Sequence, residues 1–207
     1  TLLEWYRQGF DHYLLMSEVE ELVIACLGEK PVYRYSYRSL FLDQLQLDPL
    51  RASPGEVAAA AREAVDTVDL GDDRDAWLDL LMSHVIEPRL PAGLCFIHDY
   101  PASQAALARV VTEDGVEVGR RFELYVDGVE LANGYCELTD PVEQRQRFRD
   151  DNRRRRARGR PERPLDENLL AAMEHGLPEC SGVALGVDRL LMLAGGETDI
   201  RKVLAFD

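Results

Sequence analysis

The sequence predicts an α+β fold in which antiparallel strands are flanked by helices and interrupted by a helical insertion. Two features predict this class. Alternating runs at 120–126 and 129–135 are joined by Asp127-Gly128, which is typical of a hairpin turn because both central residues need positive φ. At both ends of the chain, a strand-like run leads directly into a helical pattern. The remaining elements are consistent with one domain over residues 1–207.

The amino-terminal part predicts a strand at 2–7 and a helix at 11–27, which Gly28 stops. The predicted core side of this helix is Leu14, Leu15, Val19, Leu22, Val23 and Cys26. The insertion, residues 31–90, is predicted to contain helices at 36–45 and 72–84, and a third that begins at the capping box Ser53-Pro54-Gly55-Glu56. Nothing in the insertion gathers chemistry, so it is predicted to pack against the core or to face a partner.

After residue 91 the pattern changes to strands. The first is predicted at 94–98, before the two hairpin strands. Helices are expected at 141–158 and 166–175, and Gly176 is the expected cap of the second. A strand at 181–186 then runs into a helix at 187–194.

Composition excludes several classes of protein. No apolar run reaches the roughly 18 residues that span a membrane, and no signal peptide is present, so a cytoplasmic enzyme is expected. The four cysteines are too widely spread for a zinc site or a disulfide framework, and are expected to be buried and reduced. The first residue is Thr1 rather than Met, so further chain upstream is expected.

Charge is unevenly distributed along the chain. The net charge of −14 would repel a nucleic-acid backbone, yet residues 145–163 contain ten arginines. This run has two interpretations: a solvated helix face, or a docking surface for an acidic partner, RNA or protein.

The predicted hairpin brings two carboxylates together. If Val126 pairs with Val129, then Glu123 lies opposite Ala132, and Glu123 and Glu130 form a diagonal pair on one face, with β-carbons about 7 Å apart. Such a pair suits Mg²⁺, which takes one or two carboxylates together with phosphate oxygens and water. The alternative is that both glutamates face solvent.

Asn133, Tyr135 and Glu137 recur at period two, and would form a cradle for a cationic amine. In a regular ladder Asn133 would point away from Glu130. A shared site therefore requires a β-bulge near residues 132–134.

The segment from Gly182 to Arg189 places small residues on a strand and an arginine in the first turn of a helix. Small residues let a planar ligand lie on the backbone, and a guanidinium can stack on a base or bind phosphate. The alternative is a strand-to-helix turn with a surface arginine.

The segments LLEWYR, RFELYVDGVELANGYCELTDP and GVALGVDRLLML, in this order and spacing, resemble the catalytic domain of class II lysyl-tRNA synthetases. YPASQAALA and ECSGVALGVDR are more similar to the stand-alone paralogues that attach (R)-β-lysine to a lysine of elongation factor P. Ala184 carries the distinction, since the synthetases typically have Gly there. One methyl group is worth about 1–3 kcal/mol of discrimination.

The resemblance implies a six- to seven-stranded antiparallel sheet, a homodimer, and activation of (R)-β-lysine by ATP and Mg²⁺ as an aminoacyl adenylate. Transfer would go to elongation factor P, and no tRNA substrate is expected. Glu123 and Glu130 would bind the metal, and Arg189, with Asn133 and Gly186, the nucleotide. The implied amino-acid pocket is lined by Glu4, Tyr6, Asn133, Tyr135, Glu137 and Ala184, with Ser103 and Gln104 as further candidates.

Two departures leave other interpretations open. The family's first motif and the first strand of its second motif are absent, together with an arginine that grips the α-phosphate, so this chain alone is expected to be inactive or poorly soluble. The alternatives to the ligase are a catalytic fragment of a lysyl-tRNA synthetase and a non-catalytic binding module.

Overall fold

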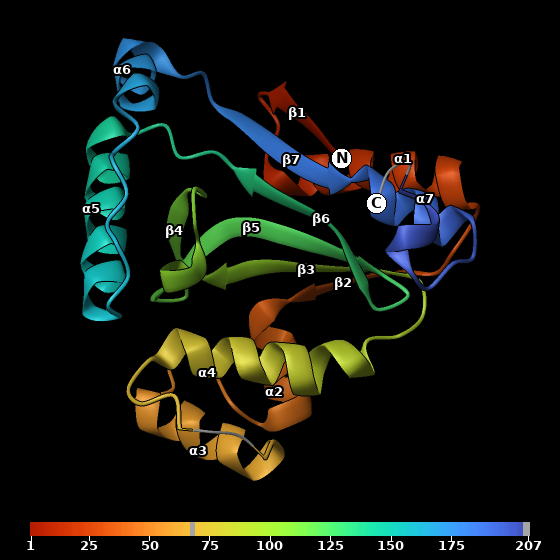
Figure 1. Ribbon diagram of the computed structural model, residues 1–207, viewed down its shortest axis with the longest axis horizontal. Coiled ribbons are helices and arrows are strands. Elements are labelled where there is room, and N and C mark those ends of the chain that lie inside the picture. Colours follow the sequence, from red (N-terminus) through yellow and green to blue (C-terminus); the bar gives the residue numbers. More distant parts are fainter. Residues whose placement is uncertain (67–68, 205–207) are drawn as a thin grey trace.

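A twisted sheet forms the centre of the computed structural model, which describes residues 1–66 and 69–204 (Figure 1). Its strands are β1 (Leu2–Gln8), β2 (Val32–Ser36), β3 (Leu94–Pro101), β4 (Val110–Glu113), β5 (Val116–Val126), β6 (Val129–Cys136) and β7 (Cys180–Gly186). The α-helices are α1 (His12–Leu27), α2 (Tyr37–Leu45), α3 (Pro54–Ala64), α4 (Arg74–Leu81), α5 (Pro141–Ala157), α6 (Glu167–Gly176) and α7 (Val187–Ala194). Short helical turns are η1 (Met82–Ile86), η2 (Glu87–Arg89), η3 (Ala102–Gln104) and η4 (Ile200–Lys202).

The strand order is β1-β7-β6-β5-β3-β2, and β4 pairs with β5. The α+β class is confirmed, but the sheet is mixed, because β2 runs parallel to β3. The strand β2 also lies at the start of the insertion, residues 31–90, for which only helices were predicted. Its five residues, VYRYS, are too few for their alternation to stand out beside the following helix.

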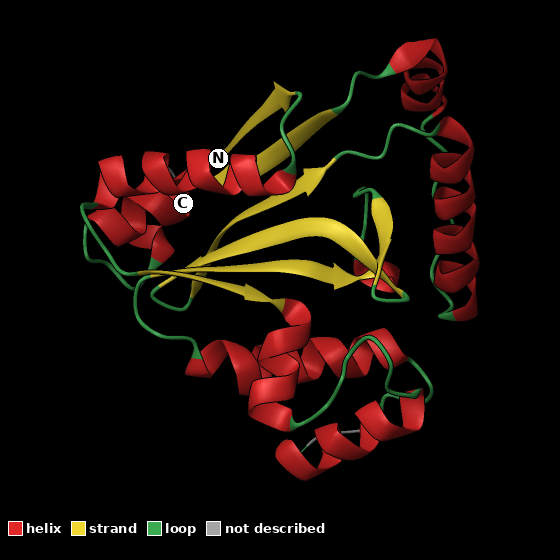
Figure 2. Ribbon diagram, turned by 180° about the vertical axis from the view of Figure 1, so that it is seen from behind, coloured by secondary structure: helices red, strands yellow, loops and turns green. Residues whose placement is uncertain are grey.

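One face of the sheet is covered by α1 and α7 (Figure 2). Leu15, Met16, Val19 and Val23 of α1 are fully buried against strand residues such as Phe122. The prediction for this helix was wrong at two positions, because Leu14 and Cys26 are both exposed. The buried side includes His12 and Met16 instead. Cys26 is therefore also the exception among the cysteines, since the other three are buried and all four are free.

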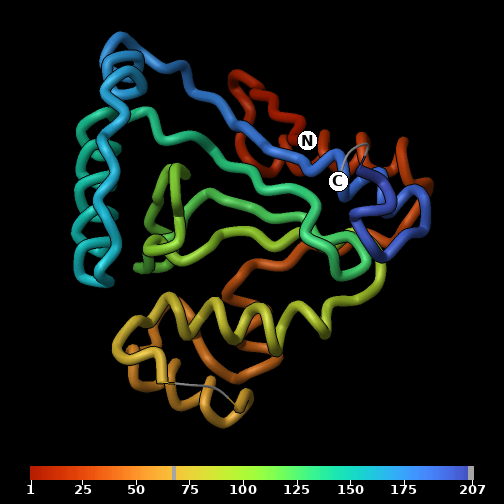
Figure 3. Tube along the Cα trace, viewed as in Figure 1, coloured from red at the N-terminus to blue at the C-terminus, as the bar shows by residue number. Residues whose placement is uncertain are grey.

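The opposite face is divided between the insertion and an open polar surface. The chain leaves the sheet after β2, forms α2, α3 and α4, and returns as β3 (Figure 3). Trp77, Phe41 and their neighbours pack beneath Cys95, Ile97 and Tyr125 of the sheet. Toward β1 the face is polar and accessible, since Glu4 and Tyr6 are exposed. The predicted capping box of Ser53 and Glu56 is present.

The hairpin β5–β6 has the predicted turn and the predicted bulge, the latter displaced by one residue. Asp127 and Gly128 both have positive φ, 49° and 81°. The register shifts between Tyr125↔Glu130 and Leu124↔Ala132, so the extra residue is Leu131. The ladder is regular from Ala132 onward, and Glu123 lies opposite Asn133 rather than Ala132. Because the bulge precedes Ala132, Glu130 and Asn133 share one face.

A buried hydrogen-bond network joins α1 to β3 and β5 at Asp99, whose backbone has φ of 56°. Its carboxylate accepts hydrogen bonds from the Tyr13 hydroxyl (2.7 Å) and the Arg120 guanidinium (2.7 Å), and contacts the rings of His12 and His98. Burial alone would raise the pKa of Asp99, but these partners outweigh it and hold the pKa well below its usual range.

Candidate active site on the polar sheet face

Two rows of side chains cross the open face of the sheet at right angles to its strands. In the first row, strand register places Glu4 opposite Ala184, Ala184 opposite Asn133, and Asn133 opposite Glu123. With strands about 4.8 Å apart, this row spans about 14 Å. The structure thus brings four predicted residues from four strands into one line.

The second row lies one pleat further along. It consists of Tyr6, Gly182, Tyr135 and Arg121. A β-carbon on Gly182 would come within 2.5 Å of the Tyr6 ring and 2.7 Å of Glu137 Oε1. Glycine is therefore needed here, because the aromatic ring and the carboxylate occupy the space above its backbone.

Glu137 is a half-buried carboxylate for which the structure gives no hydrogen-bond partner among the described residues. Burial raises the pKa of Glu137 to about 7. Burial also raises the pKa of Tyr6, with further contributions from the charges of Glu137 and Glu4. A cationic ligand bound beside these groups would lower the pKa of Glu137 and favour its charged form.

Glu123 is held from three sides. Its Oε2 atom accepts hydrogen bonds from the hydroxyls of Tyr100 (2.7 Å) and Tyr125 (2.8 Å), and its Oε1 atom is paired with Arg121. Arg121 also donates to the Gln104 carbonyl (2.9 Å) and to Asn133 Oδ1 (3.3 Å). The carboxylate is thus fixed in position, and one lone pair of Oε1 remains for a further ligand.

Glu130 lies at the other end of the bulge, where its carboxylate pairs with Arg189 at 3.3 Å. Arg189 is exposed and stands in the first turn of α7, beside Gly186. The prediction that this arginine lies at the strand-to-helix turn is confirmed. Arg189 also donates to the main-chain carbonyl of Glu130. An exposed ion pair of this kind is weak, so an anionic ligand would compete with the Glu130 carboxylate for the guanidinium.

The carboxylates near the bulge, Glu87, Glu123 and Glu130, line one cavity and are the candidates for holding a divalent cation. Burial raises the pKa of Glu87, and the charges of Glu123 and Glu130 add to the rise. Three acidic groups therefore interact at this point, and the unshared oxygen positions of Glu123 and Glu130 are of the kind that Mg²⁺ takes. Among the predicted residues, Glu123 and Glu130 are the ones that would hold it.

Ser103 and Gln104 lie beside Arg121 of the second row, at a cavity that the insertion helps to build. The Ser103 hydroxyl donates to Asp75 (2.7 Å) and the Gln104 amide to Asp79 (2.8 Å). Both acceptors belong to α4, so a helix of the insertion contributes two carboxylates to the lining of this cavity. Asp75 and Asp79 were missed because they are spaced as on any amphipathic helix, and only folding brings them to β5.

Arg121, Tyr125 and Tyr100 were also missed. A signal existed for the first two, because Arg121, Glu123 and Tyr125 recur at period two and must share a face. Tyr100 reaches Glu123 only because β3 pairs with β5, which its local sequence does not indicate.

The arginine run occupies α5 and the loop after it, beside α6 (Figure 1). Several of its members pair with nearby carboxylates: Arg145 with Glu167, Arg147 with Glu143, Arg154 with Asp151 and Arg156 with Glu162. Arg158 pairs with Asp73 of the insertion. Both earlier interpretations of this run stay open.

Comparison with known proteins identifies the family of this chain. Residues 41–207 match the family model described as tRNA synthetases class II (D, K and N). The chain belongs to this class II tRNA synthetase family. The mixed sheet with its flanking helices is thus a class II tRNA synthetase domain.

Within this family, three relatives are named elongation factor P–(R)-beta-lysine ligase. They come from Salmonella typhi, Salmonella paratyphi B and Salmonella heidelberg, and each is 49% identical to the whole chain. The chain spans 64% of the length of these relatives. Among the described residues of this synthetase-family chain, every helix is too short or too polar to cross a bilayer.

Proposed function

We propose that the protein activates (R)-β-lysine with ATP and transfers it to a lysine side chain of elongation factor P. The observation that carries this proposal is the separation of carboxylates on the polar face: Glu4 and Glu137 lie near Tyr6, and Glu123 and Glu130 lie on the β5–β6 hairpin. We assign the first pair to an amine and the second pair to a metal. The ligase names of the Salmonella relatives support it. Enzyme class, substrate and partner are all part of the proposal.

The amine end of the substrate would lie at Glu137, Glu4 and Tyr6, with Tyr135 as a wall. A cationic ammonium there would lower the pKa of Glu137 and keep its carboxylate charged. Ala184 lies between Glu4 and Asn133, so its methyl group would shape the floor of the pocket between amine and carboxyl. This position suits discrimination between lysine isomers.

The carboxyl end would lie toward Asn133 and Glu123, where it meets the ATP α-phosphorus. The substrate carboxylate attacks, pyrophosphate leaves, and an aminoacyl adenylate forms without the need for a base. Mg²⁺ on Glu123 and Glu130 would neutralise phosphate charge. Arg189 would turn from Glu130 to the adenine or the terminal phosphates, while Gly186 leaves room beside it and Asn133 borders the same site.

Arg121 has a supporting role in this proposal. Its bonds to Glu123 and Asn133 fix both side chains before substrates bind. Preorganised charges of this kind supply much of the acceleration in phosphoryl-group chemistry.

Three further features of the proposal concern the oligomeric state, the location and the exclusion of tRNA. We propose a homodimer, as the family resemblance implies, and a cytoplasmic location, because a translation factor is the acceptor. We propose no tRNA substrate, although the family model also covers synthetases that charge tRNA, which keeps a lysyl-tRNA synthetase fragment as the second candidate.

The test is an assay of the protein at its full encoded length, with ATP, Mg²⁺ and (R)-β-lysine. Elongation factor P and tRNA-Lys are offered in parallel. A mass gain of one lysyl group on the factor, with uncharged tRNA, is expected. Charged tRNA with an unmodified factor would favour the synthetase, and modification of neither would favour the binding module.

A further inference from the structure

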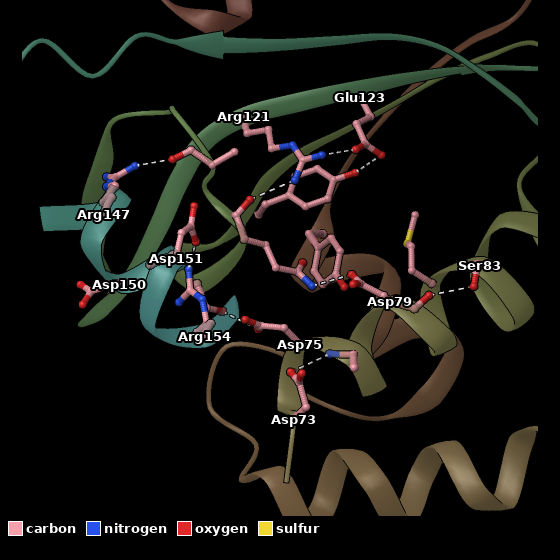
Figure 4. Close-up of a pocket in the computed structure, with 18 of the residues that line it drawn as sticks. Asp73, Asp75, Asp79, Ser83, Arg121, Glu123, Arg147, Asp150, Asp151 and Arg154 are labelled. Atoms are coloured by element: carbon pink, nitrogen blue, oxygen red, sulfur yellow. Dashed lines mark hydrogen bonds and ion pairs between the residues drawn. The ribbon is translucent and has the colours of Figure 1, made fainter. Parts of the chain in front are cut away.

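A cavity of about 1010 Å³ opens between α4, β5 and α5, next to the two rows (Figure 4). Its α4 wall carries Asp75 and Asp79, and its floor carries Arg121 and Glu123. On the far side, Arg147 and Arg154 come from α5, each already paired with a carboxylate of its own helix. The cavity therefore reaches the carboxylate that we assign to the metal.

Tyr37 also lines this cavity, and its hydroxyl is a buried polar group that is left unsatisfied within the described part of the chain. Its side chain is 1% exposed, yet its hydroxyl has no hydrogen-bond partner among the described residues. Asp75, Asp79 and Glu123 line the same cavity. Burial raises the pKa of Tyr37, and the charges of Asp79, Glu123 and Asp75 raise it further. A buried hydroxyl without a partner is costly, and native proteins rarely leave one unless a ligand or water completes it.

The charges around Tyr37 define the kind of ligand that fits. An anion would be repelled by Asp75, Asp79 and Glu123. A primary ammonium carries three donors, enough to reach the Tyr37 oxygen and a carboxylate together. Asp79 is accessible from the open cavity, and although Gln104 binds its Oδ1 atom, Oδ2 has no partner among the described contacts. Burial and the charge of Asp75 raise the pKa of Asp79, which is consistent with a role in accepting a proton.

We propose that this cavity receives the amine of the acceptor lysine, with Tyr37 and Asp79 as its binding groups. The inference rests on the proposed function, and it names the site of the second half of that reaction. An amine here lies beside Glu123, at the end of the row where the activated carboxyl is expected. The substrate's own amine is accounted for at the opposite end, by Glu137 and Glu4.

The transfer step forms an amide bond and breaks the bond between the acyl group and AMP. Asp79 accepts one proton from the acceptor ammonium, and the freed nitrogen lone pair attacks the carbonyl carbon of the adenylate. The new N–C amide bond forms as the C–O bond to AMP breaks, and the bond pair leaves with AMP. The nitrogen loses its second proton to solvent.

The test separates the two halves of the reaction in Tyr37→Phe and Asp79→Asn. Both variants keep the shape of the side chain, so packing is preserved. We expect ATP–pyrophosphate exchange with (R)-β-lysine to stay within about twofold of the unmodified enzyme. Transfer to elongation factor P should fall at least about tenfold in Asp79→Asn, in kcat, and about fivefold in Tyr37→Phe, in KM for the factor.

Matched controls are Tyr33→Phe, a half-buried tyrosine that does not line the cavity, and Asp72→Asn, an exposed aspartate just before α4. Both should leave exchange and transfer unchanged. Unchanged transfer in the two test variants would overturn the inference. A raised KM for free (R)-β-lysine in exchange would also overturn it, because the cavity would then bind the amino acid. No exchange by the unmodified enzyme would instead overturn the proposed function itself.

Discussion

At the scale of single residues, the charged form of Glu137 carries a cost to folding, and in the proposed function the same carboxylate binds the substrate amine. The folded protein holds a proton on this carboxyl up to about pH 7, whereas the unfolded chain releases it near pH 4.5. Its contribution to stability is therefore fully present below about pH 4.5 and is lost as pH rises through 7. A bound ammonium would lower the pKa of Glu137 and favour its charged form. The negative charge on Glu137 therefore opposes folding of the ligand-free protein but would favour binding of a cationic ligand.

Replacing Glu137 by Gln should raise the free energy of unfolding of the ligand-free protein at pH 8 by about 1–3 kcal/mol, because no buried carboxylate then has to ionise. The gain should vanish near pH 4.5. Denaturant unfolding at both pH values measures it, with the exposed glutamate variant Glu21→Gln as control. A variant that is less stable at pH 8 would show that Glu137 has a cationic partner in the folded protein.

Gly182 supplies a steric test of the amino-acid pocket. Gly182→Ala would place a methyl group against Tyr6 and Glu137, and we expect the KM for the amino acid in pyrophosphate exchange to rise at least about tenfold. Gly186→Ala is the matched variant, since its β-carbon meets Arg189 no closer than 3.5 Å. An equal effect of both variants on the amino-acid KM would contradict the assigned pocket.

At the scale of elements, the hairpin β5–β6 shows what local sequence can predict. Its turn follows from Asp127-Gly128, and its need for a bulge follows from the spacing of Glu130 and Asn133. The position of the bulge does not follow, because the side chain of Leu131 is apolar and packs in the core beside Leu124. Either Leu131 or Ala132 could be the extra residue by pattern alone.

The turn itself should be sensitive to a side chain. Gly128→Ala is expected to lower the free energy of unfolding by about 1–2 kcal/mol, because φ at this residue is 81°. Gly55→Ala, in the first turn of α3, should be neutral or stabilising by up to about 1 kcal/mol, since its φ is not positive and nothing lies within 4 Å of the added methyl. Thermal melting compares the two, and equal losses would mean that the turn is not under this constraint.

At the scale of the whole molecule, the predictable part of the fold is the part with local periodicity. The strand-to-helix units at each end, the hairpin and the helices of the insertion all followed from alternation, helical spacing and caps. The parallel strand β2, the α4 wall and the contacts of Asp99 did not, because each depends on partners distant in sequence. The members of the first row were all predicted as candidate residues, whereas Arg121 of the second row was missed, and the alignment of both rows requires the register of four strands.

Asp99 provides a test of how these distant parts hold together. Asp99→Asn should lower the free energy of unfolding by on the order of 3 kcal/mol at pH 7, because Arg120 loses a buried anionic partner. The depressed pKa of Asp99 means that this stabilisation is present above about pH 4 and is lost as pH falls further. The variant should therefore differ least from the parent in acid.

Asp114→Asn is the control for backbone effects, since Asp114 also has positive φ but is exposed. Urea unfolding at pH 7 and in acid distinguishes the two. A pH-independent loss in Asp99→Asn, matched by Asp114→Asn, would assign the effect to backbone conformation and not to charge.

The most direct test of the central claim is ATP–pyrophosphate exchange by the protein at its full encoded length, with (R)-β-lysine compared with α-lysine. The two rows and the methyl group of Ala184 predict Mg²⁺-dependent exchange with a higher kcat/KM for (R)-β-lysine, and loss of that exchange in Glu123→Gln. Absence of exchange with either isomer, or exchange that survives Glu123→Gln unchanged, would contradict the assignment of the polar sheet face as the site of activation.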